Sequence, residues 1–467
     1  MSSIEPVGGG RVTLRRAEIV VRVDAAATPA SVWAAAALAS MAARLAGHVV
    51  VPAVSLPRPN PWGARTLTAV TGTSRFGRGG RHGVTKRITV GEGPHAAASD
   101  LYVGGDDWTA VVSRDGPVPV GDCPLGGLGV QVAAALAFGE VVKDLMPAPD
   151  QVRIEDELRW SLLTGRVGGA PSPPFGPDVV PQKVALLGAG SVGSSAAALL
   201  AMCNVTGVVD VVDPDTFDPN RNAYRCPGVP AAELGHKAEW AAGVLRAAGW
   251  EAAAHRTTVA GWAGNRGPGF PGIALVCVDN VDGRREAGDL LAATTVSAGV
   301  GGIALHVQRH LPADDLACPY CDFVDAGRWS GQAGTYARLG VTGPRLQALL
   351  DGDVLSTDDV AKAIWAGAVE PGVMASLPGR RLVDLLHRPG VLAPQVSAPH
   401  VSWLAGALVA AEVVKAAAGV AGLDRRVDVD LAGVPLGGWR RPIRNPSGRC
   451  PCSNPARRQL ARSLYGQ

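Results

Sequence analysis

The sequence predicts an α/β protein whose C-terminal part is a Rossmann-like lobe, with an additional N-terminal α/β lobe before it. The apolar run 184–187 lacks polar alternation and stops at glycine, as a buried parallel strand does. The turn GAGSVGS follows, and the alanine-rich segment 194–202 is a good helix former. A second apolar strand, 208–212, ends at Asp213, which is placed to bind a ribose hydroxyl. This order of elements is typical of a nucleotide-binding unit, in which a phosphate meets the helix N-terminus.

Length and charge limit the classes of function. A chain of 467 residues is too long for one ordinary domain. The formal net charge of +3, from 44 Lys and Arg against 41 Asp and Glu, argues against a protein that coats nucleic acid. The first residues lack the apolar core of a secretory signal, and the uncharged stretch 184–209 fits strand, turn and helix better than a membrane span. We therefore expect a cytoplasmic protein with neither a nucleic acid nor a membrane as partner.

Composition along the chain predicts where the lobes meet. Segment 165–181 is dense in Gly and Pro, which indicates a linker between an N-terminal lobe, 1–164, and the Rossmann-like lobe, 182–467. An apolar helix is expected at 125–146, and its tetrapeptide Glu-Val-Val-Lys recurs in a second apolar helix at 401–418. Two interpretations remain open: chance similarity between Ala- and Val-rich helices, or two related lobes of which the first has lost its glycine loop.

Charged residues after the glycine loop distinguish between nucleotides. Asn222, Arg225 and Lys237 follow Asp213, and Asp279 stands at the end of a later apolar strand. Singly, the two cations could be surface residues and Asp279 could cap the helix that begins two residues later. As an ordered set they favour ATP, because a triphosphate needs cations and a carboxylate for Mg²⁺, whereas a nicotinamide dinucleotide needs mainly the glycines and Asp213.

With these residues in place, the stretch from 183 to 420 resembles the ubiquitin-activating-enzyme-like adenylyltransferases, the ThiF/MoeB/HesA group. The resemblance implies that fold and an ATP-dependent activation of the C-terminal carboxylate of a small ubiquitin-like protein or peptide, with release of pyrophosphate. It implies roles as follows: Gly188, Gly190 and Gly193 line the nucleotide, Asp213 binds the ribose, Asn222, Arg225 and Lys237 hold phosphates, and Asp279 carries Mg²⁺. Arg225, Lys237 and Asp279 are then the catalytic residues. One extra residue between Asp213 and Asn222, and Cys226 where the family often has Gln, depart from the pattern.

Four cysteines form a second set. Cys318-x-x-Cys321 has the spacing of a zinc knuckle, and Cys450-x-Cys452 supplies two more thiolates for a tetrahedral structural Zn²⁺ site. The family commonly has two such pairs. Unpaired reduced thiols, or a redox pair at Cys318 and Cys321, are the alternatives.

The resemblance also bears on partners and mechanism. Segment 322–400 matches the crossover loop that passes over the bound peptide tail in the family, and it contains no cysteine. Cys226, where Arg225 is expected to favour a thiolate, is the one weak candidate for a thioester, so adenylation without a covalent intermediate is expected. Family members dimerise, so a homodimer or an internal pseudo-dimer is expected. The alternatives are an NAD(P)- or FAD-dependent oxidoreductase and an inactive scaffold that binds a ubiquitin-like partner.

Overall fold

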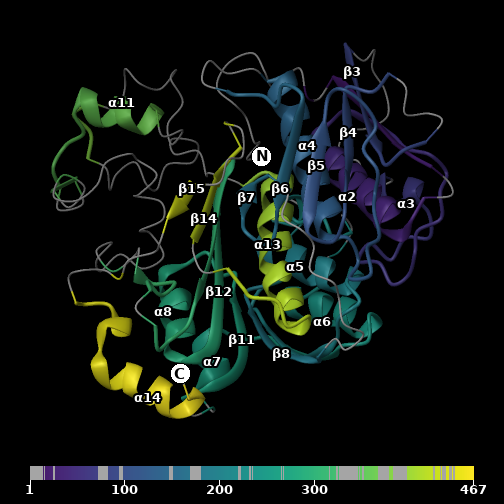
Figure 1. Ribbon diagram of the computed structural model, residues 1–467. Helices are drawn as coiled ribbons and strands as arrows, with labels where there is room; N and C mark the ends of the chain where they lie inside the picture. The colour runs from purple at the N-terminus through teal and green to yellow at the C-terminus, as the bar shows by residue number, and fades with distance from the viewer. Residues whose placement is uncertain are drawn as a thin grey trace.

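Two sheets, one in each half of the chain, frame the protein in the computed structural model (Figure 1). The strands of the first sheet are β1 (Ala17–Val23), β2 (His48–Val50), β3 (Val84–Val90), β4 (Leu101–Gly105), β5 (Thr109–Ser113), β6 (Glu157–Ser161) and β7 (Arg166–Val167). Those of the second are β8 (Gln182–Leu187), β9 (Gly207–Val212), β10 (Glu251–His255), β11 (Phe270–Val276), β12 (Ala292–Gly301), β13 (Ala304–His310), β14 (Arg426–Asp430) and β15 (Gly438–Arg440). The protein is thus a mixed α/β fold, as expected.

The structure describes residues 16–24, 27–71, 83–93, 98–146, 151–168, 180–218, 222–230, 235–264, 268–314, 316–321, 352–365, 378–381, 397–423, 426–431 and 448–466, with shorter pieces between these ranges. The helices are α2 (Pro29–Leu45), α3 (Leu67–Thr71), α4 (Leu128–Leu145), α5 (Ser191–Met202), α6 (Lys237–Ala247), α7 (Val259–Ala263), α8 (Val281–Asp289), α11 (Thr357–Trp365), α13 (Pro399–Ala417) and α14 (Pro455–Tyr465). Most of the expected linker, and most of the expected crossover segment 322–400, lie outside the described residues.

The strand, turn, helix and strand expected around the glycines are confirmed as β8, α5 and β9. Helix α5 begins at Ser191, three residues earlier than expected, and β11 ends at Val276, two residues earlier. The first sheet continues to Val167, which lies inside the segment expected to be linker. Among the described helices, α13 alone is long and apolar enough to cross a membrane, but 94% of its apolar window is buried inside the protein. A core helix passes the same test, so this is weak evidence for a span.

The two sheets repeat one strand order. In the first, β2, β1, β3 and β4 run parallel in that spatial order, and β5, β6 and β7 continue antiparallel. In the second, β9, β8, β11 and β12 run parallel, and β13, β14 and β15 continue antiparallel, with β10 added at the edge. Helix α2 follows β1 and helix α5 follows β8, the first strand of each sheet in the sequence. Helix α4 precedes β6 and helix α13 precedes β14, and these two strands hold equivalent positions in their sheets.

Helices α4 and α13 carry the same buried ion pair. Lys143 pairs with Glu140 in α4, and the other oxygen of Glu140 accepts a hydrogen bond at 2.9 Å from the backbone N–H of Ile154, just before β6. Lys415 lies 2.6 Å from Glu412 in α13, and that glutamate accepts an equivalent bond at 2.9 Å from the loop before β14. All four side chains are buried. Because a buried ion pair is costly to desolvate, its recurrence with the same loop contact is not explained by an Ala- and Val-rich composition alone.

The two halves meet through these helices, and α13 runs through the centre of the molecule beside α4 and α5 (Figure 1). The ring of His400, at the start of α13, makes an edge contact with Phe138 of α4 at 5.7 Å between centroids. His400 is 1% exposed, and burial, with a smaller effect of Lys143, lowers its pKa to about 3. The folded protein therefore holds this imidazole neutral.

Acidification should destabilise the protein through His400. The pKa of His400 is lower in the folded than in the unfolded chain, so between about pH 6.5 and pH 3 the unfolded chain binds one more proton. The free energy of unfolding therefore decreases as the pH is lowered through this range. This single group should add a slope approaching about 1.4 kcal/mol per pH unit. Urea unfolding of wild type and His400→Gln from pH 7.5 to 5 should show a shallower decline in the variant. The control is His48→Gln, at a histidine whose side chain is 36% exposed; equal slopes in wild type and His400→Gln would contradict the prediction.

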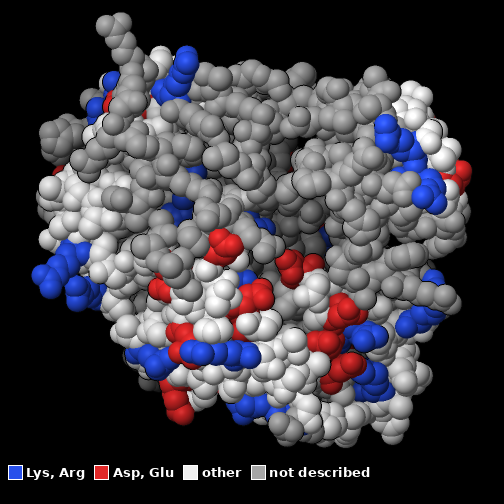
Figure 2. All heavy atoms as spheres, turned by 180° about the vertical axis from the view of Figure 1, so that it is seen from behind, with Lys and Arg blue, Asp and Glu red and all other residues white. Residues whose placement is uncertain are grey.

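On the opposite face, Lys and Arg side chains are interspersed with Asp and Glu over the described surface (Figure 2). The described part of this face therefore presents mixed charge.

Candidate active site and four-cysteine cluster

The loop between β8 and α5 needs two of its three glycines for close packing. Gly188 has φ +88°, and a Cβ there would lie 3.0 Å from the backbone of Cys277 and Val278, at the end of β11. A Cβ on Gly193 would lie 1.9 Å from the carbonyl oxygen of Gly188. Gly190 differs, because nothing lies within 4 Å of the Cβ position. The loop is thus packed against β11 on one side and is open at Gly190.

The first helices of the two halves begin differently. Gly190 is the N-cap of α5 and provides no side chain to bond the free N–H groups of the first turn. In α2 the hydroxyl of Thr28 accepts a bond from the N–H of Ser31 at 3.3 Å, and Pro29 removes another N–H group. The start of α5 is therefore open to an external anion, whereas the start of α2 is closed by its own residues.

Asp213, at the end of β9, is 5% exposed and already bound to the protein. Its Oδ2 accepts a hydrogen bond at 2.7 Å from the N–H of Ala189, and its Oδ1 accepts one at 2.9 Å from the N–H of Asp215. Burial raises the pKa of this carboxyl, which Lys237 and the two backbone bonds partly oppose. Asp213 thus ties the glycine loop to the end of β9, a role that the sequence alone did not suggest, and its role in binding ribose stays a prediction.

Lys237 is brought to the same place. It is the first residue of α6, is 7% exposed, and places its Nζ 2.8 Å from Oδ2 of Asp215 and 3.8 Å from Oδ1 of Asp213. Since α6 packs on α5, the lysine is held beside the glycine loop rather than free on the surface. The sequence-based alternative of a solvated surface cation is wrong for Lys237.

Asn222 and Arg225 belong to a short 3₁₀ turn, Ala223–Arg225 and its N-cap. The amide of Asn222 accepts a bond from the N–H of Asp218 at 2.8 Å and donates one to the carbonyl of Thr216 at 3.4 Å, so it shapes its own loop. Arg225 is half-buried, and its buried Nε has no hydrogen-bond partner within the described part of the chain. The roles of both residues toward phosphate stay predictions.

Cys226 corrects the expectation of an activated thiol. The side chain is 1% exposed, and burial raises its pKa, although Ser194, Arg225 and other cations act in the opposite direction. The thiol is therefore held neutral, and a neutral buried thiol is a poor nucleophile. The proximity of Arg225 was visible in the sequence, but the burial that outweighs it was not.

Asp279 stands exposed beyond the end of β11. The alternative that it caps helix α8 is wrong, because Oδ1 of Asn280 accepts the capping bond from the N–H of Gly283 at 2.6 Å. Within the described residues Asp279 makes no hydrogen bond or ion pair. Strands β9, β8 and β11 are neighbours and run parallel, so Asp213, the glycine loop and Asp279 follow carboxyl ends at the same edge of the sheet.

The four cysteines of the second set come together. Their sulfur atoms all lie within 4.8 Å of one another, with Sγ–Sγ distances of 3.3 Å between Cys321 and Cys452, 3.4 Å between Cys318 and Cys450, and 3.8 Å between Cys318 and Cys321. A tetrahedral ion with bonds of about 2.3 Å requires sulfur atoms about 3.8 Å apart, so the set is compact enough to close on one. No pair of these cysteines forms a disulfide. The cluster is consistent with structural Zn²⁺.

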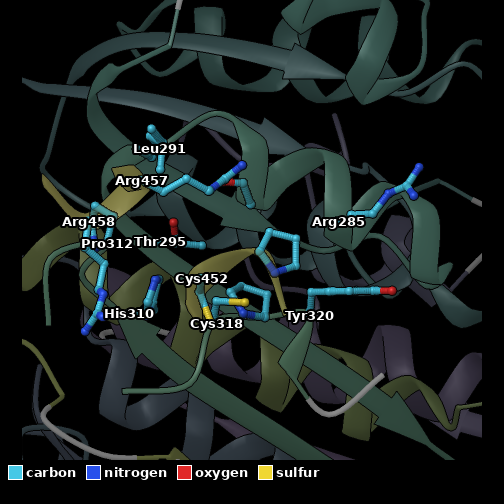
Figure 3. Close-up of a pocket in the computed structure, with 14 residues that line it drawn as sticks. Arg285, Leu291, Thr295, His310, Pro312, Cys318, Tyr320, Cys452, Arg457 and Arg458 are labelled. Atoms are coloured by element: carbon cyan, nitrogen blue, oxygen red, sulfur yellow. The ribbon is translucent and has the colours of Figure 1, made fainter. Parts of the chain in front are cut away.

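A pocket lies beside this cluster (Figure 3). Cys318 and Cys452 line it together with three arginines and Tyr320. Of the arginines, Arg457 lies 2.6 Å from Asp289 and also donates to the carbonyl of Gly288 at 2.8 Å. Four thiolates around Zn²⁺ would carry two net negative charges, which nearby arginines would partly offset.

Comparisons with known proteins found a curated relative and several distantly similar solved structures. No family model matches the chain. The chain is 25% identical over 414 residues to the uncharacterized protein y4jF of Sinorhizobium fredii, covering 83% of this chain and 79% of y4jF. Its structure is similar to that of E. coli MccB, an E1-like adenylyltransferase of the ThiF family.

Three solved structures give the extent of that likeness. The complex of E. coli MccB with ATP matches with a TM-score of 0.36 and 15% identity over 57% of this chain and 65% of MccB, just under two thirds of it. MccB with N-formylated MccA matches with a TM-score of 0.36 and 16% identity, over 58% of this chain and 67% of that one. PaaA matches with a TM-score of 0.34 and 16% identity, over 56% and 72%. Likenesses of this degree leave the activity to be argued from the residues of the chain itself.

Proposed function

We propose that this protein is an ATP-dependent adenylyltransferase that activates the C-terminal carboxylate of a small ubiquitin-like protein or peptide. The observation that carries the proposal is the edge formed by β9, β8 and β11. A buried lysine held by two carboxylates, a glycine loop open at Gly190, and the exposed carboxylate of Asp279 follow three adjacent strand ends. Positive charge, free N–H groups and a carboxylate for a cation are the groups that a triphosphate requires.

The chemistry follows from these groups. A carboxylate oxygen of the acceptor attacks the α-phosphorus of ATP, a new oxygen–phosphorus bond forms, and the bond to the bridging oxygen breaks, so that pyrophosphate leaves with the bonding electrons. Two anions must approach each other, and the role of Lys237 and Arg225 is to lower that repulsion and fix an in-line arrangement. Bound Mg²⁺, for which Asp279 is the proposed ligand, would neutralise the charge at the α-phosphate.

The oxidoreductase alternative accounts for fewer of the residues. It uses the glycines and Asp213 but assigns no role to the buried Lys237 or to the uncommitted carboxylate of Asp279. The scaffold alternative needs none of these groups to be kept at one edge of the sheet. Both alternatives therefore explain fewer of these residues than adenylation does. A measurement of which nucleotide the protein binds distinguishes all three.

The repeated strand order supports an internal pseudo-dimer. We propose that the N-terminal half is a degenerate copy of the adenylating half, because both have the same order of strands and the same ion pair on α4 and α13. The closed start of α2 and the open start of α5 support a nucleotide site in the second half only. The segment 322–400 is the proposed cover for the acceptor peptide, and the four cysteines the proposed Zn²⁺ site.

Nucleotide binding and isotope exchange test the function. The protein should bind ATP in the presence of Mg²⁺, measured by calorimetry, at least about tenfold more tightly than NAD⁺, NADP⁺ or FAD, since only ATP engages the cations and Mg²⁺ together. With a peptide that ends in Gly-Gly as acceptor, labelled pyrophosphate should exchange into ATP in a Mg²⁺-dependent manner. Preferential binding of a dinucleotide would establish the oxidoreductase, and failure to bind any of these nucleotides would establish the scaffold.

A further inference from the structure

The turn that follows Arg225 is held by a side chain from the other half of the protein. Arg44, on α2, donates through Nη2 to the carbonyl oxygens of Cys226 at 2.9 Å and Val229 at 2.5 Å. These bonds join residues separated by 182 and 185 positions in the sequence. One guanidinium thus binds both ends of the turn 226–229.

Two further donors from the N-terminal half bind the middle of the turn. The hydroxyl of Ser40 and the indole N–H of Trp62 both donate to the carbonyl of Pro227, at 2.5 and 2.8 Å. Nη1 of Arg44 in turn donates to the hydroxyl and the carbonyl of Ser40 at 2.6 and 2.9 Å, and Trp62 stacks on Trp403 of α13 at 6.1 Å. Three carbonyls of one turn therefore accept their bonds from a single preformed set of donors.

The burial of Arg44 is unfavourable for the stability of the fold. Arg44 is 7% exposed and faces no carboxylate among the described residues, and burial lowers its pKa to about 10. The guanidinium nevertheless stays charged at neutral pH. A buried cation without a counter-ion costs several kcal/mol of desolvation free energy, while an apolar residue would fill the same space at lower cost. The charge and the geometry of its donors therefore indicate a requirement beyond packing.

The turn lies between the predicted phosphate site and the core. It directly follows Arg225, and it rests on α5, since a Cβ on Gly228 would lie 2.6 Å from Ala198 of that helix. Cys226 and Val229 pack with Phe217 and Ala223, the residues that flank the Asn222 loop. A displacement of this turn would therefore move the backbone of Arg225 relative to α5 and its open N-terminus.

We infer that Arg44 is a positioning residue supplied by the N-terminal half, which fixes turn 226–229 and thereby holds Arg225 at the phosphate end of the nucleotide site. The C-terminal half is then incomplete without α2: it closes the turn with a bond from the N–H of Val229 to the carbonyl of Cys226, but within the described residues the carbonyls of Pro227 and Val229 accept bonds only from the N-terminal half. This inference rests on the proposed adenylation for its effect on rate, but the bracing of the turn is independent of it.

The test compares Arg44→Met and Arg44→Lys with Arg246→Met, a control at an exposed arginine in the last turn of α6. In ATP–pyrophosphate exchange, Arg44→Met should lower kcat by about 10- to 100-fold, with KM for the acceptor peptide within about twofold of wild type. Arg44→Lys keeps the charge but can bind only part of the turn, so its kcat should lie between those of wild type and Arg44→Met. The control should match wild type.

A second readout does not depend on activity. Cys226 is a buried residue of the braced turn itself. Its alkylation by N-ethylmaleimide, measured by peptide mass spectrometry, should accelerate at least about tenfold in Arg44→Met, because local opening of the turn increases. Buried Cys203, at the end of α5, should react as slowly as in wild type. Faster labelling of both thiols, or labelling and exchange unchanged from wild type, would overturn the inference. If wild type shows no exchange, the proposed function fails, while selective labelling of Cys226 still decides the bracing role.

Discussion

Asp279→Ala should reduce ATP–pyrophosphate exchange by about 100- to 1000-fold, the loss expected when one group that stabilises developing charge is removed. The carboxylate is exposed, makes no hydrogen bond within the described residues, and does not cap α8. The fold therefore does not depend on it, and the melting temperature should change by less than about 2 °C, as for most exposed substitutions. Initial exchange rates at saturating Mg²⁺ and ATP, with thermal unfolding in parallel, measure both effects.

The matched control is Asp282→Ala, in the first turn of α8 and three residues further along the chain. It removes the same charge from the same region, but from within α8 rather than from the loop between β11 and that helix, so exchange should stay within about threefold of wild type, in keeping with the weak effect of a screened charge. Exchange that survives Asp279→Ala at the wild-type rate would show that this carboxylate does not hold the catalytic Mg²⁺. Equal losses in both variants would indicate a general effect of surface charge instead.

Cys318→Ser should release the C-terminal tail. Cys318 and Cys450 are 132 positions apart, so the cluster closes a long loop just before α14, whose Arg457 bonds to Asp289 of α8. A structural Zn²⁺ contributes its binding free energy to folding, and losing one ligand should lower the melting temperature by on the order of 10 °C. Elemental analysis should find about one Zn²⁺ per wild-type chain and much less in the variant. Limited proteolysis with trypsin should then cut within α14, after Arg457 or Arg458.

Cys123→Ser is the control for the zinc prediction, because Cys123 is a half-buried thiol outside the cluster. It should keep the metal content, the melting temperature and the protease resistance of wild type. Wild-type protein free of metal, or a tail that stays protected in Cys318→Ser, would contradict a structural role for Zn²⁺ in this cluster.

The sequence predicted those parts of the site that depend on local pattern. An apolar run ending in glycine specified β8, the alanine-rich segment specified α5, and the spacing of four cysteines specified a cluster between residues far apart in the chain. Each signal is contained in a few consecutive residues, where the periodicity of strands and helices or the geometry of a ligand set limits the possibilities.

Features that depend on tertiary packing could not be predicted. Arg44 looks like a surface cation in an alanine-rich helix, and only the fold shows that it reaches a turn in the other half. In the sequence, Arg225 beside Cys226 favours a thiolate, but burial has the larger effect and raises the pKa of this thiol. The tetrapeptide shared by α4 and α13 hinted at a repeat, and the strand order and the matching ion pairs that support this interpretation are visible only in the fold.

The packing of α4 against α13 means that the two halves stay together in dilute solution. In a protein whose active site needs a second subunit, the complete site disappears as the concentration falls below the dissociation constant of the dimer. Here both halves belong to one polypeptide, and α2, α4, α5 and α13 share a single hydrophobic core. Their association is intramolecular and cannot be lost by dilution. One gene thus fixes the ratio of the N-terminal half to the C-terminal half at one to one, whatever the level of expression.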